Sequence, residues 1–300
     1  VTFVHLHPAI YGGDTLVRIM NADRVLLAYQ LPLLQLLIYL LNLVSSDPLL
    51  IRYLMSLVGA LAGAAFYLFS ATLLDRPTAR LASLFFVFNP FLLVHSIVPY
   101  QEILMLLALC LGLYFLLRPD LRGSIGWASL SLGLACLTRY EAWVITAAAG
   151  LYYARLQLTV RSSRSHSRVL GQTMVLFGWA PLLWILLHRG VSPQGTYVLE
   201  EPATWTRLWR IPYVTAMALH HAGPVVGLLA SFGLLTFWKA SLWRKREIQM
   251  VLAAAALLML SLVFSAHGVN PDPQRYVTDR EAHWFVLFPF WAAALGLFDI

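Results

Sequence analysis

The stretch "PYQEILMLLALCLGLYFLL", residues 99–117, indicates what kind of fold this sequence forms. From Ile103 to Leu117 it contains no charged residue and no polar face of the kind that a surface helix carries. A helix that is hydrophobic on all sides lies in a large protein core or in a lipid bilayer. The stretch therefore predicts a membrane helix that opens with one carboxylate, Glu102, at the membrane boundary.

The composition of the whole chain is typical of a polytopic membrane protein. Of its 300 residues, 60% are hydrophobic and 12% are charged, and the mean hydropathy is +0.72. Soluble domains have about 45–50% apolar and about 25% charged residues. The net charge of +7 comes from short basic clusters between apolar runs. Such clusters orient membrane proteins, so the lipid bilayer is an expected partner and nucleic acid is not.

Apolar runs of the length that a membrane helix needs cover most of the chain. They predict an all-α fold with eight or nine spans, depending on whether residues 124–156 form one helix broken at "TRYE" or a pair. The runs are 50–74, 80–98, 102–118, 124–138, 140–156, 169–188, 222–240, 249–267 and 283–298. Residues 25–44 contain Pro32, two glutamines and Asn42, and predict a helix that lies in the membrane interface.

The chain is expected to form a single domain, residues 1–300. Residues 1–48 would be a first extracytoplasmic loop with interfacial helices, and residues 49–300 about eight membrane helices with an outer loop at 189–221. A chain that starts without Met and without the basic region of a signal peptide is also expected to be a fragment that lacks an earlier helix.

The basic residues predict which loops face the cytoplasm, because short loops rich in Lys and Arg stay there. If the spans alternate from residue 50, the cytoplasmic loops are "DRPTAR", "RPDLR", "RLQLTVRSSRSHSR" and "KASLWRKRE", which hold more than half of the 21 Lys and Arg residues. Asp14, Glu102, Arg139, Glu141 and residues 267–283 then share the extracytoplasmic face. A polar site on that face is therefore expected.

Asp14 is the first candidate for chemistry. Gly12 and Gly13 permit a tight turn before it, and a helix is predicted from Thr15 to Tyr29. Asp14 could cap that helix and pair with Arg18 at i+4, or it could act as a general base above the membrane surface. The two roles are compatible.

Glu102 and the pair Arg139 and Glu141 are the other polar residues at helix boundaries. Glu102 is either a partner of the helix dipole or a group that faces a polar cavity, and ionisable residues at this depth usually do the latter. Arg139 and Glu141, in "LTRYEAW", either form an ion pair at a helix break or belong to the site.

Two late arginines, Arg275 and Arg280, precede the last apolar run in "NPDPQRYVTDREAHWFVLFPF". A guanidinium fork suits bidentate recognition of phosphate. The alternative is an interfacial anchor, since His283 and Trp284 follow closely. The histidines at 5, 7, 220 and 221 lack the i, i+4 spacing of a helical zinc site, so the sequence indicates no metal or other cofactor.

The order of five segments resembles the GT-C superfamily of glycosyltransferases, above all the branch with the protein O-mannosyltransferases and the aminoarabinose transferase of lipid A. The segments are "YGGDTLVRIMNAD", "LPLLQLLIYLL", "PYQEILMLLALCLGLYFLL", "GLACLTRYEAW" and the late "RY" running into "FVLFPFWAAALGL". The resemblance covers nearly the whole chain in order and topology. Many members carry two adjacent acids in the first loop, whereas here Thr15 follows Asp14.

The resemblance implies a GT-C-like helical bundle whose extracytoplasmic loops carry the active site, in a prokaryotic plasma membrane. The donor would be a polyprenyl- or dolichyl-phosphate-linked sugar, and the acceptor a hydroxyl of a protein, lipid or glycan. Asp14 would be the catalytic base, Glu102 a second catalytic acid, and Arg275, Tyr276 and Arg280 would bind the lipid phosphate. The remaining polar residues, Arg139, Glu141 and His283, would support these groups.

Two other functions stay open on the sequence. A multi-pass transporter or flippase would place polar residues near the middle of the membrane and would often pair broken helices. An O-antigen-ligase-like enzyme, which uses a diphosphate-linked glycan, would share the face and the arginines.

Overall fold

A computed structural model describes residues 4, 13–26, 30–160, 166–189, 215–216, 219–220, 222–239, 241–264 and 287–298, and of Asp14 it describes the backbone alone. These parts of the chain form helices and no strands, which confirms the all-α prediction. The helices are α2 (Gly13–Met20), α3 (Pro32–Asn42), α4 (Leu49–Leu73), α5 (Arg76–Val87), α6 (Pro90–Ile97), α7 (Gln101–Leu117), α8 (Ser124–Cys136), α9 (Glu141–Val160), α10 (His166–Arg189), α12 (Pro224–Lys239), η2 (Leu242–Arg244), α13 (Arg246–Phe264) and α14 (Leu287–Phe298).

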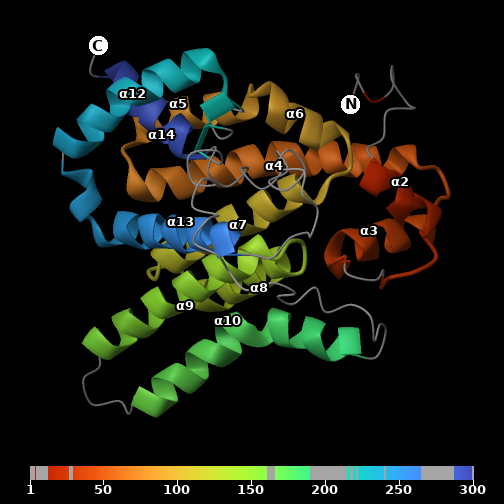
Figure 1. The fold of residues 1–300 in the computed structure, drawn as a ribbon. Helices are drawn as coiled ribbons and strands as arrows, with labels where there is room; N and C mark the ends of the chain where they lie inside the picture. The colour runs from red at the N-terminus through yellow and green to blue at the C-terminus, as the bar shows by residue number, and fades with distance from the viewer. Residues whose placement is uncertain are drawn as a thin grey trace.

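Helices α4 and α7 form the centre of the bundle (Figure 1). The bent pair α5 and α6 returns the chain between them, so α4 and α7 both start at the same end. Helix α8 packs between α7 and α10, and α13 packs on α9. Helix α14 covers α5 and carries α12 on its outer side. Phe66 of α4 joins these layers, since it stacks on Phe86 of α5 at 4.9 Å and on Trp291 of α14 at 5.8 Å.

The close approach of α12 and α14 depends on a glycine. A Cβ atom at Gly233 would overlap the carbonyl group of Ala292. Because a carbonyl oxygen belongs to the backbone and cannot swing aside, only glycine allows this separation. Small residues at helix contacts are the usual way for membrane helices to pack tightly.

The run 80–98, predicted as one helix, is two helices bent by 60°. Pro90 supplies no N–H to a continuous helix, and the side chain of Asn89 accepts a hydrogen bond of 3.1 Å from the N–H of Leu92, which starts a new helix. The predicted pair within 124–156 is present as α8 and α9.

The helix predicted from Thr15 to Tyr29 is also wrong in its extent, because α2 begins at Gly13 and ends at Met20. The amide of Asn21 donates to the carbonyl of Val17 at 2.8 Å, and residues 21–23 form a turn. A polar amide that bonds to its own backbone favours a turn over a continued helix. Asp14 therefore lies in the first helical turn and not before it.

Two of the described helices are long and apolar enough to cross a membrane, namely α4 and residues 166–187 of α10. A third span results if α5 and α6 are taken together. The other described helices do not meet both conditions, so the total of about eight spans stays a prediction. The interfacial helix predicted within 25–44 corresponds in position to the shorter α3.

Helix α5 has a capping residue whose removal gives a testable effect. Burial raises the pKa of Asp75, but hydrogen bonds from the hydroxyl and N–H of Thr78 and the charge of Lys245 hold this pKa below its ordinary value. A depressed carboxyl pKa gives stability that is complete above the ordinary pKa and is lost as pH falls through the depressed one.

We expect Asp75→Ala to lower the free energy of unfolding by about 0.5–2 kcal/mol, and Asp75→Asn by less, because asparagine also caps helices. Thermal unfolding of the detergent-solubilised protein at neutral pH measures both. The wild-type advantage over Asp75→Ala should shrink as the pH is lowered into the acid range. An advantage that grows on acidification would contradict the capping role.

Candidate functional site

An ion-pair cluster around one buried carboxylate lies where α7 and α9 begin. Glu102 is only 1% exposed, and its Oε1 accepts a hydrogen bond of 2.6 Å from Nη1 of Arg139. Arg139 also donates from Nε to both carboxylate oxygens of Glu141, at 3.1 Å each, and from Nη2 to Glu141 Oε1. One guanidinium thus links two carboxylates, and we call these three residues the Glu102–Arg139–Glu141 cluster.

The second oxygen of Glu102 is the least satisfied polar atom of this cluster. Glu102 Oε2 is buried and has no hydrogen-bond partner among the described residues. A buried acceptor without a partner costs about 1–3 kcal/mol, and more when it is charged. Such an atom calls for an explanation, and a ligand that supplies a donor is one. The helix dipole at the start of α7 also stabilises the negative charge of Glu102.

The break between α8 and α9 places Arg139 in the cluster. The indole Nε1 of Trp143 donates to the carbonyl of Cys136 at 2.8 Å, and the N–H of Leu33 donates to the carbonyl of Leu137 at 2.9 Å. These bonds satisfy carbonyls that the end of α8 would otherwise leave without partners. The break is therefore held by tertiary contacts with α3 and α9, and Arg139 emerges from it toward Glu102.

Helix α2 is fixed against the segment that leads into α7. The hydroxyl of Thr15 donates to the carbonyl of Pro99 at 2.8 Å, and Nη2 of Arg18 donates to Oε1 of Gln101 at 2.9 Å. Gln101 is the residue before Glu102, and Asp14 is the residue before Thr15. The backbone of Asp14 is thus part of the helix that packs against the start of α7. An ion pair between Arg18 and Asp14 stays a prediction, because the Asp14 side chain lies outside the described part of the chain.

Two buried polar residues that sequence reasoning did not assign hold this end together. Nε2 of Gln35 donates to the carbonyls of Arg18, Asn21 and Arg24 at 3.2, 2.8 and 2.9 Å, which fastens the turn after α2. Nε of Arg52, which is fully buried, donates to the carbonyl of Ile97 at 3.1 Å. In the sequence each of these two residues is a lone polar residue inside an apolar run, and such a residue usually faces a polar interior.

We refer to this region as the site end: α2, the starts of α4, α7 and α9, and the Glu102–Arg139–Glu141 cluster. The predicted phosphate-binding residues Arg275, Tyr276 and Arg280, the supporting residue His283 and most of the loop 189–221 lie outside the described residues. Glu102, Arg139 and Glu141 are brought together as one group. Within the described residues no three His, Cys, Asp or Glu side chains are grouped so that they could hold a metal ion.

Comparisons with known proteins bear on the fold. No family model matches the chain, and a search of curated proteins finds no match. Among solved structures the chain is similar to the crystal structure of ArnT from Cupriavidus metallidurans in the apo state, with a TM-score of 0.60 and 15% sequence identity. The similarity covers 94% of this chain and 53% of that one, so the chain spans about half the length of ArnT. The chain is therefore an all-α membrane protein whose helical fold is similar to that of ArnT.

Proposed function

We propose that this protein is a glycosyltransferase that moves a sugar from a polyprenyl- or dolichyl-phosphate carrier to an acceptor hydroxyl on the extracytoplasmic face, with inversion at the anomeric carbon. The observation that carries the proposal is Glu102, a buried carboxylate whose Oε1 is held by Arg139 and whose Oε2 has no hydrogen-bond partner among the described residues. It lies beside the helix that carries Asp14, in a fold similar to that of ArnT.

The reaction needs a base, a nucleophile and a stabilised leaving group. Asp14 takes the proton of the acceptor hydroxyl while the hydroxyl oxygen attacks the anomeric carbon, and a positioned carboxylate contributes about 10²–10⁴-fold to such a step. The bond between the anomeric carbon and the phosphate oxygen breaks, and the polyprenyl phosphate leaves with the electron pair. Arg275 and Arg280, with Tyr276, stabilise that charge. A single displacement inverts the configuration.

Glu102 orients the reacting sugar in this scheme. Because Arg139 fixes Oε1, the carboxylate plane cannot rotate freely, and Oε2 accepts a hydrogen bond from a hydroxyl of the acceptor or donor. Glu141 holds Arg139 from the other side. The two carboxylates have different roles in this scheme. Asp14 accepts the proton of the acceptor hydroxyl, whereas Glu102 only accepts a hydrogen bond.

The distribution of buried polar residues favours this enzyme over a transporter. The buried residues Gln35, Arg52 and Glu102 lie at the site end, together with the half-buried Arg139. A transporter would be expected to keep ionisable residues near the midpoint of its helices, around broken helices paired across two halves. Among the described helices that are apolar enough to cross a membrane, one pair, α5 and α6, is bent at a break, and no second such pair accompanies it there.

A transfer assay separates the two functions. Sealed membranes that contain the full-length protein are incubated with a radiolabelled polyprenyl-phosphate sugar and an acceptor fraction. The enzyme predicts label covalently bound to an acceptor hydroxyl and release of free polyprenyl phosphate. Accumulation of label inside the vesicles with no new glycosidic bond would support a transporter and would contradict the proposal.

A further inference from the structure

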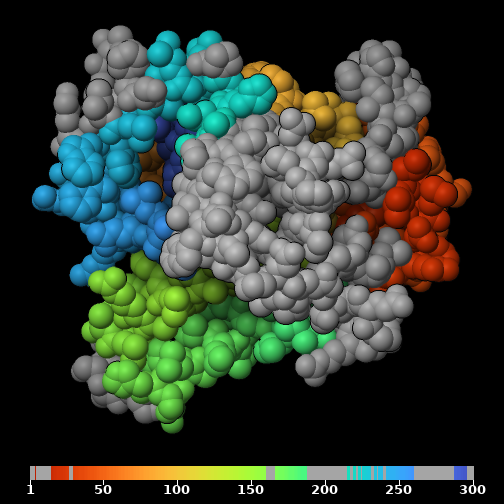
Figure 2. Space-filling model, viewed as in Figure 1, coloured from red at the N-terminus to blue at the C-terminus, as the bar shows by residue number. Residues whose placement is uncertain are grey.

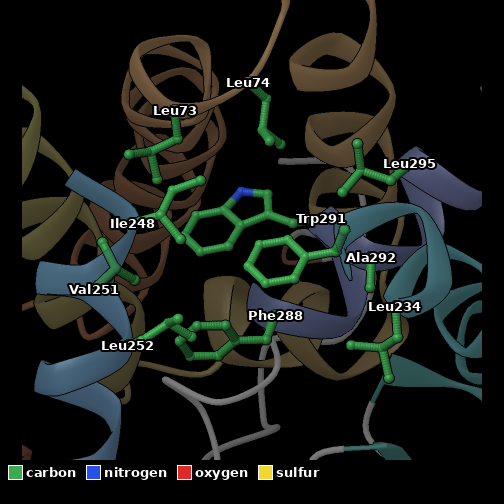
Figure 3. A pocket seen from close by; sticks show the side chains of 11 residues that line it. Leu73, Leu74, Leu234, Ile248, Val251, Leu252, Phe288, Trp291, Ala292 and Leu295 are labelled. Carbon is green, nitrogen blue, oxygen red and sulfur yellow. The ribbon is translucent and has the colours of Figure 1, made fainter. Parts of the chain in front are cut away.

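A second site lies at the opposite end of the bundle from the Glu102–Arg139–Glu141 cluster. A cavity of about 100 Å³ is lined by the end of α4, by α12 and α13 and by α14 (Figure 3). Its lining consists of apolar side chains: Leu73, Leu74, Leu234, Phe237, Ile248, Val251, Leu252, Phe288, Trp291, Ala292 and Leu295. Trp291 extends into its centre in Figure 3, and its Nε1 donates to Ser70 Oγ at 2.7 Å, so the indole presents only carbon to the cavity.

An apolar cavity of this kind does not retain water. A buried water molecule needs two to four polar partners, and an apolar cavity of about 150 Å³ stays dry and takes up apolar molecules. Leu234 and Leu252 line the cavity and are 61% and 39% exposed, so it opens onto the outer surface of α12 and α13. In Figures 1 and 2 these two helices form one side of the molecule. In a bilayer, hydrocarbon chains are what surrounds that surface.

Basic and aromatic residues border the cavity on one side. Lys245 Nζ donates to the carbonyl of Leu73, a lining residue, at 3.4 Å, and Lys245 directly precedes α13, which carries the lining residue Ile248. The guanidinium of Arg244 lies 5.1 Å from the ring centroid of Trp243. Trp243 in turn stacks on Trp238 at 5.7 Å. Stacked tryptophans with adjacent cations are typical of the boundary between hydrocarbon and lipid headgroups.

We define the basic rim as Arg244, Lys245 and Arg246, three exposed cations in sequence. None of them forms an ion pair within the described residues. Asp75, whose carboxylate is stabilised by the charge of Lys245, and Glu247, next to Arg246, are the acidic groups nearby, and Arg76 adds a further cation beside Asp75. The rim therefore keeps a net positive charge that complements a phosphate.

We propose that this end of the protein binds an anionic phospholipid, with part of one acyl chain in the cavity and its phosphate on the basic rim. The acyl chain gains little from leaving the bilayer for the cavity, because both are apolar, so contact with the rim decides which lipid binds. Basic pockets between membrane helices bind anionic headgroups by the same electrostatics. This binding site is separate from the sugar-transfer site and does not depend on the proposed function.

Native mass spectrometry of the purified full-length protein tests the headgroup. The protein is titrated with phosphatidylglycerol and with phosphatidylcholine of identical acyl chains, and we expect phosphatidylglycerol to bind more tightly. In the double variant Arg244→Gln/Lys245→Gln, the ratio of the affinities for phosphatidylglycerol and phosphatidylcholine should fall about fivefold for each charge removed. The matched control, Arg118→Gln/Arg122→Gln, removes two cations from another loop and should keep the preference of the wild type.

Photocrosslinking tests the acyl chain. Phosphatidylglycerol with a diazirine near the end of one chain should label peptides of α12, α13 and α14 that line the cavity. Leu252→Trp fills the cavity and should reduce this labelling, whereas Leu257→Trp, an exposed position of α13 outside the lining, should not. Equal binding of the two lipids, equal effects of the two double variants, or binding of polyprenyl phosphate but not of phosphatidylglycerol would overturn the proposal.

Discussion

Asp14→Asn is expected to slow sugar transfer by about 10²–10⁴-fold, because asparagine keeps the size of the side chain and cannot accept the proton of the acceptor hydroxyl. Binding of the donor should change little, since the proposed phosphate contacts come from Arg275 and Arg280. The measurement is the initial rate of label transfer in membranes that contain equal amounts of folded protein.

Asp23→Asn is the matched control for that experiment. Asp23 is a carboxylate of the same first segment, and its side chain is 74% exposed and three residues beyond the end of α2. This variant should transfer sugar at the wild-type rate. Transfer by Asp14→Asn at the wild-type rate would remove Asp14 from the mechanism, and an equal loss in both variants would point to a general effect of charge.

Arg139→Gln should be the most destabilising single change at the site end. It leaves the buried carboxylate of Glu102 and the half-buried carboxylate of Glu141 without their cation. Breaking a buried ion pair by removing one partner costs about 3–5 kcal/mol, because an uncompensated charge stays in the interior. Denaturant unfolding in detergent measures the loss. Arg118→Gln is the control, since Arg118 pairs with Asp120 where both side chains are exposed, and such pairs contribute little to stability.

The double variant Glu102→Gln/Arg139→Gln separates the lost contact from the stranded charge. With Glu102 neutral, one of the two uncompensated carboxylates is removed, so the double variant should be more stable than Arg139→Gln alone. The coupling energy of residues in one ion-pair network is about 0.5–3 kcal/mol. A cost for Arg139→Gln no greater than that for Arg118→Gln would show that the cluster is not the buried charge network described here.

Much of the helical layout could be predicted from the sequence, because apolar runs in a membrane protein are continuous and are bounded by polar residues. The helices α4, α7 and α8 start and end within two residues of the predicted runs. The bend between α5 and α6 was missed because both halves are apolar. The signal in the sequence is the pair Asn89–Pro90, a capping residue followed by a helix-starting proline.

The members of the Glu102–Arg139–Glu141 cluster could be singled out from the sequence one by one, but the bonds that join them could not. An ion pair between Arg139 and Glu141, two positions apart, was one of the two interpretations of these residues, and that pair is present. Its bond to Glu102 spans 37 positions and depends on where α8 breaks, which contacts with Leu33 and Trp143 determine. Tertiary hydrogen bonds of this kind leave no periodic trace in the sequence. Gln35 is a further case, because a buried glutamine that binds three carbonyls looks the same in sequence as an interfacial one.

The most direct test of the account is sugar transfer by Glu102→Gln, because glutamine keeps the shape of Glu102 and can still accept the hydrogen bond from Arg139. The account predicts that this variant folds, as judged by its unfolding curve, and transfers sugar about 10²-fold more slowly than wild type, the usual effect of losing one preorganised polar contact. Arg118→Gln, at the other end of the bundle, should be unaffected. A folded Glu102→Gln protein that transfers sugar at the wild-type rate would contradict the assignment of the Glu102–Arg139–Glu141 cluster to the active site.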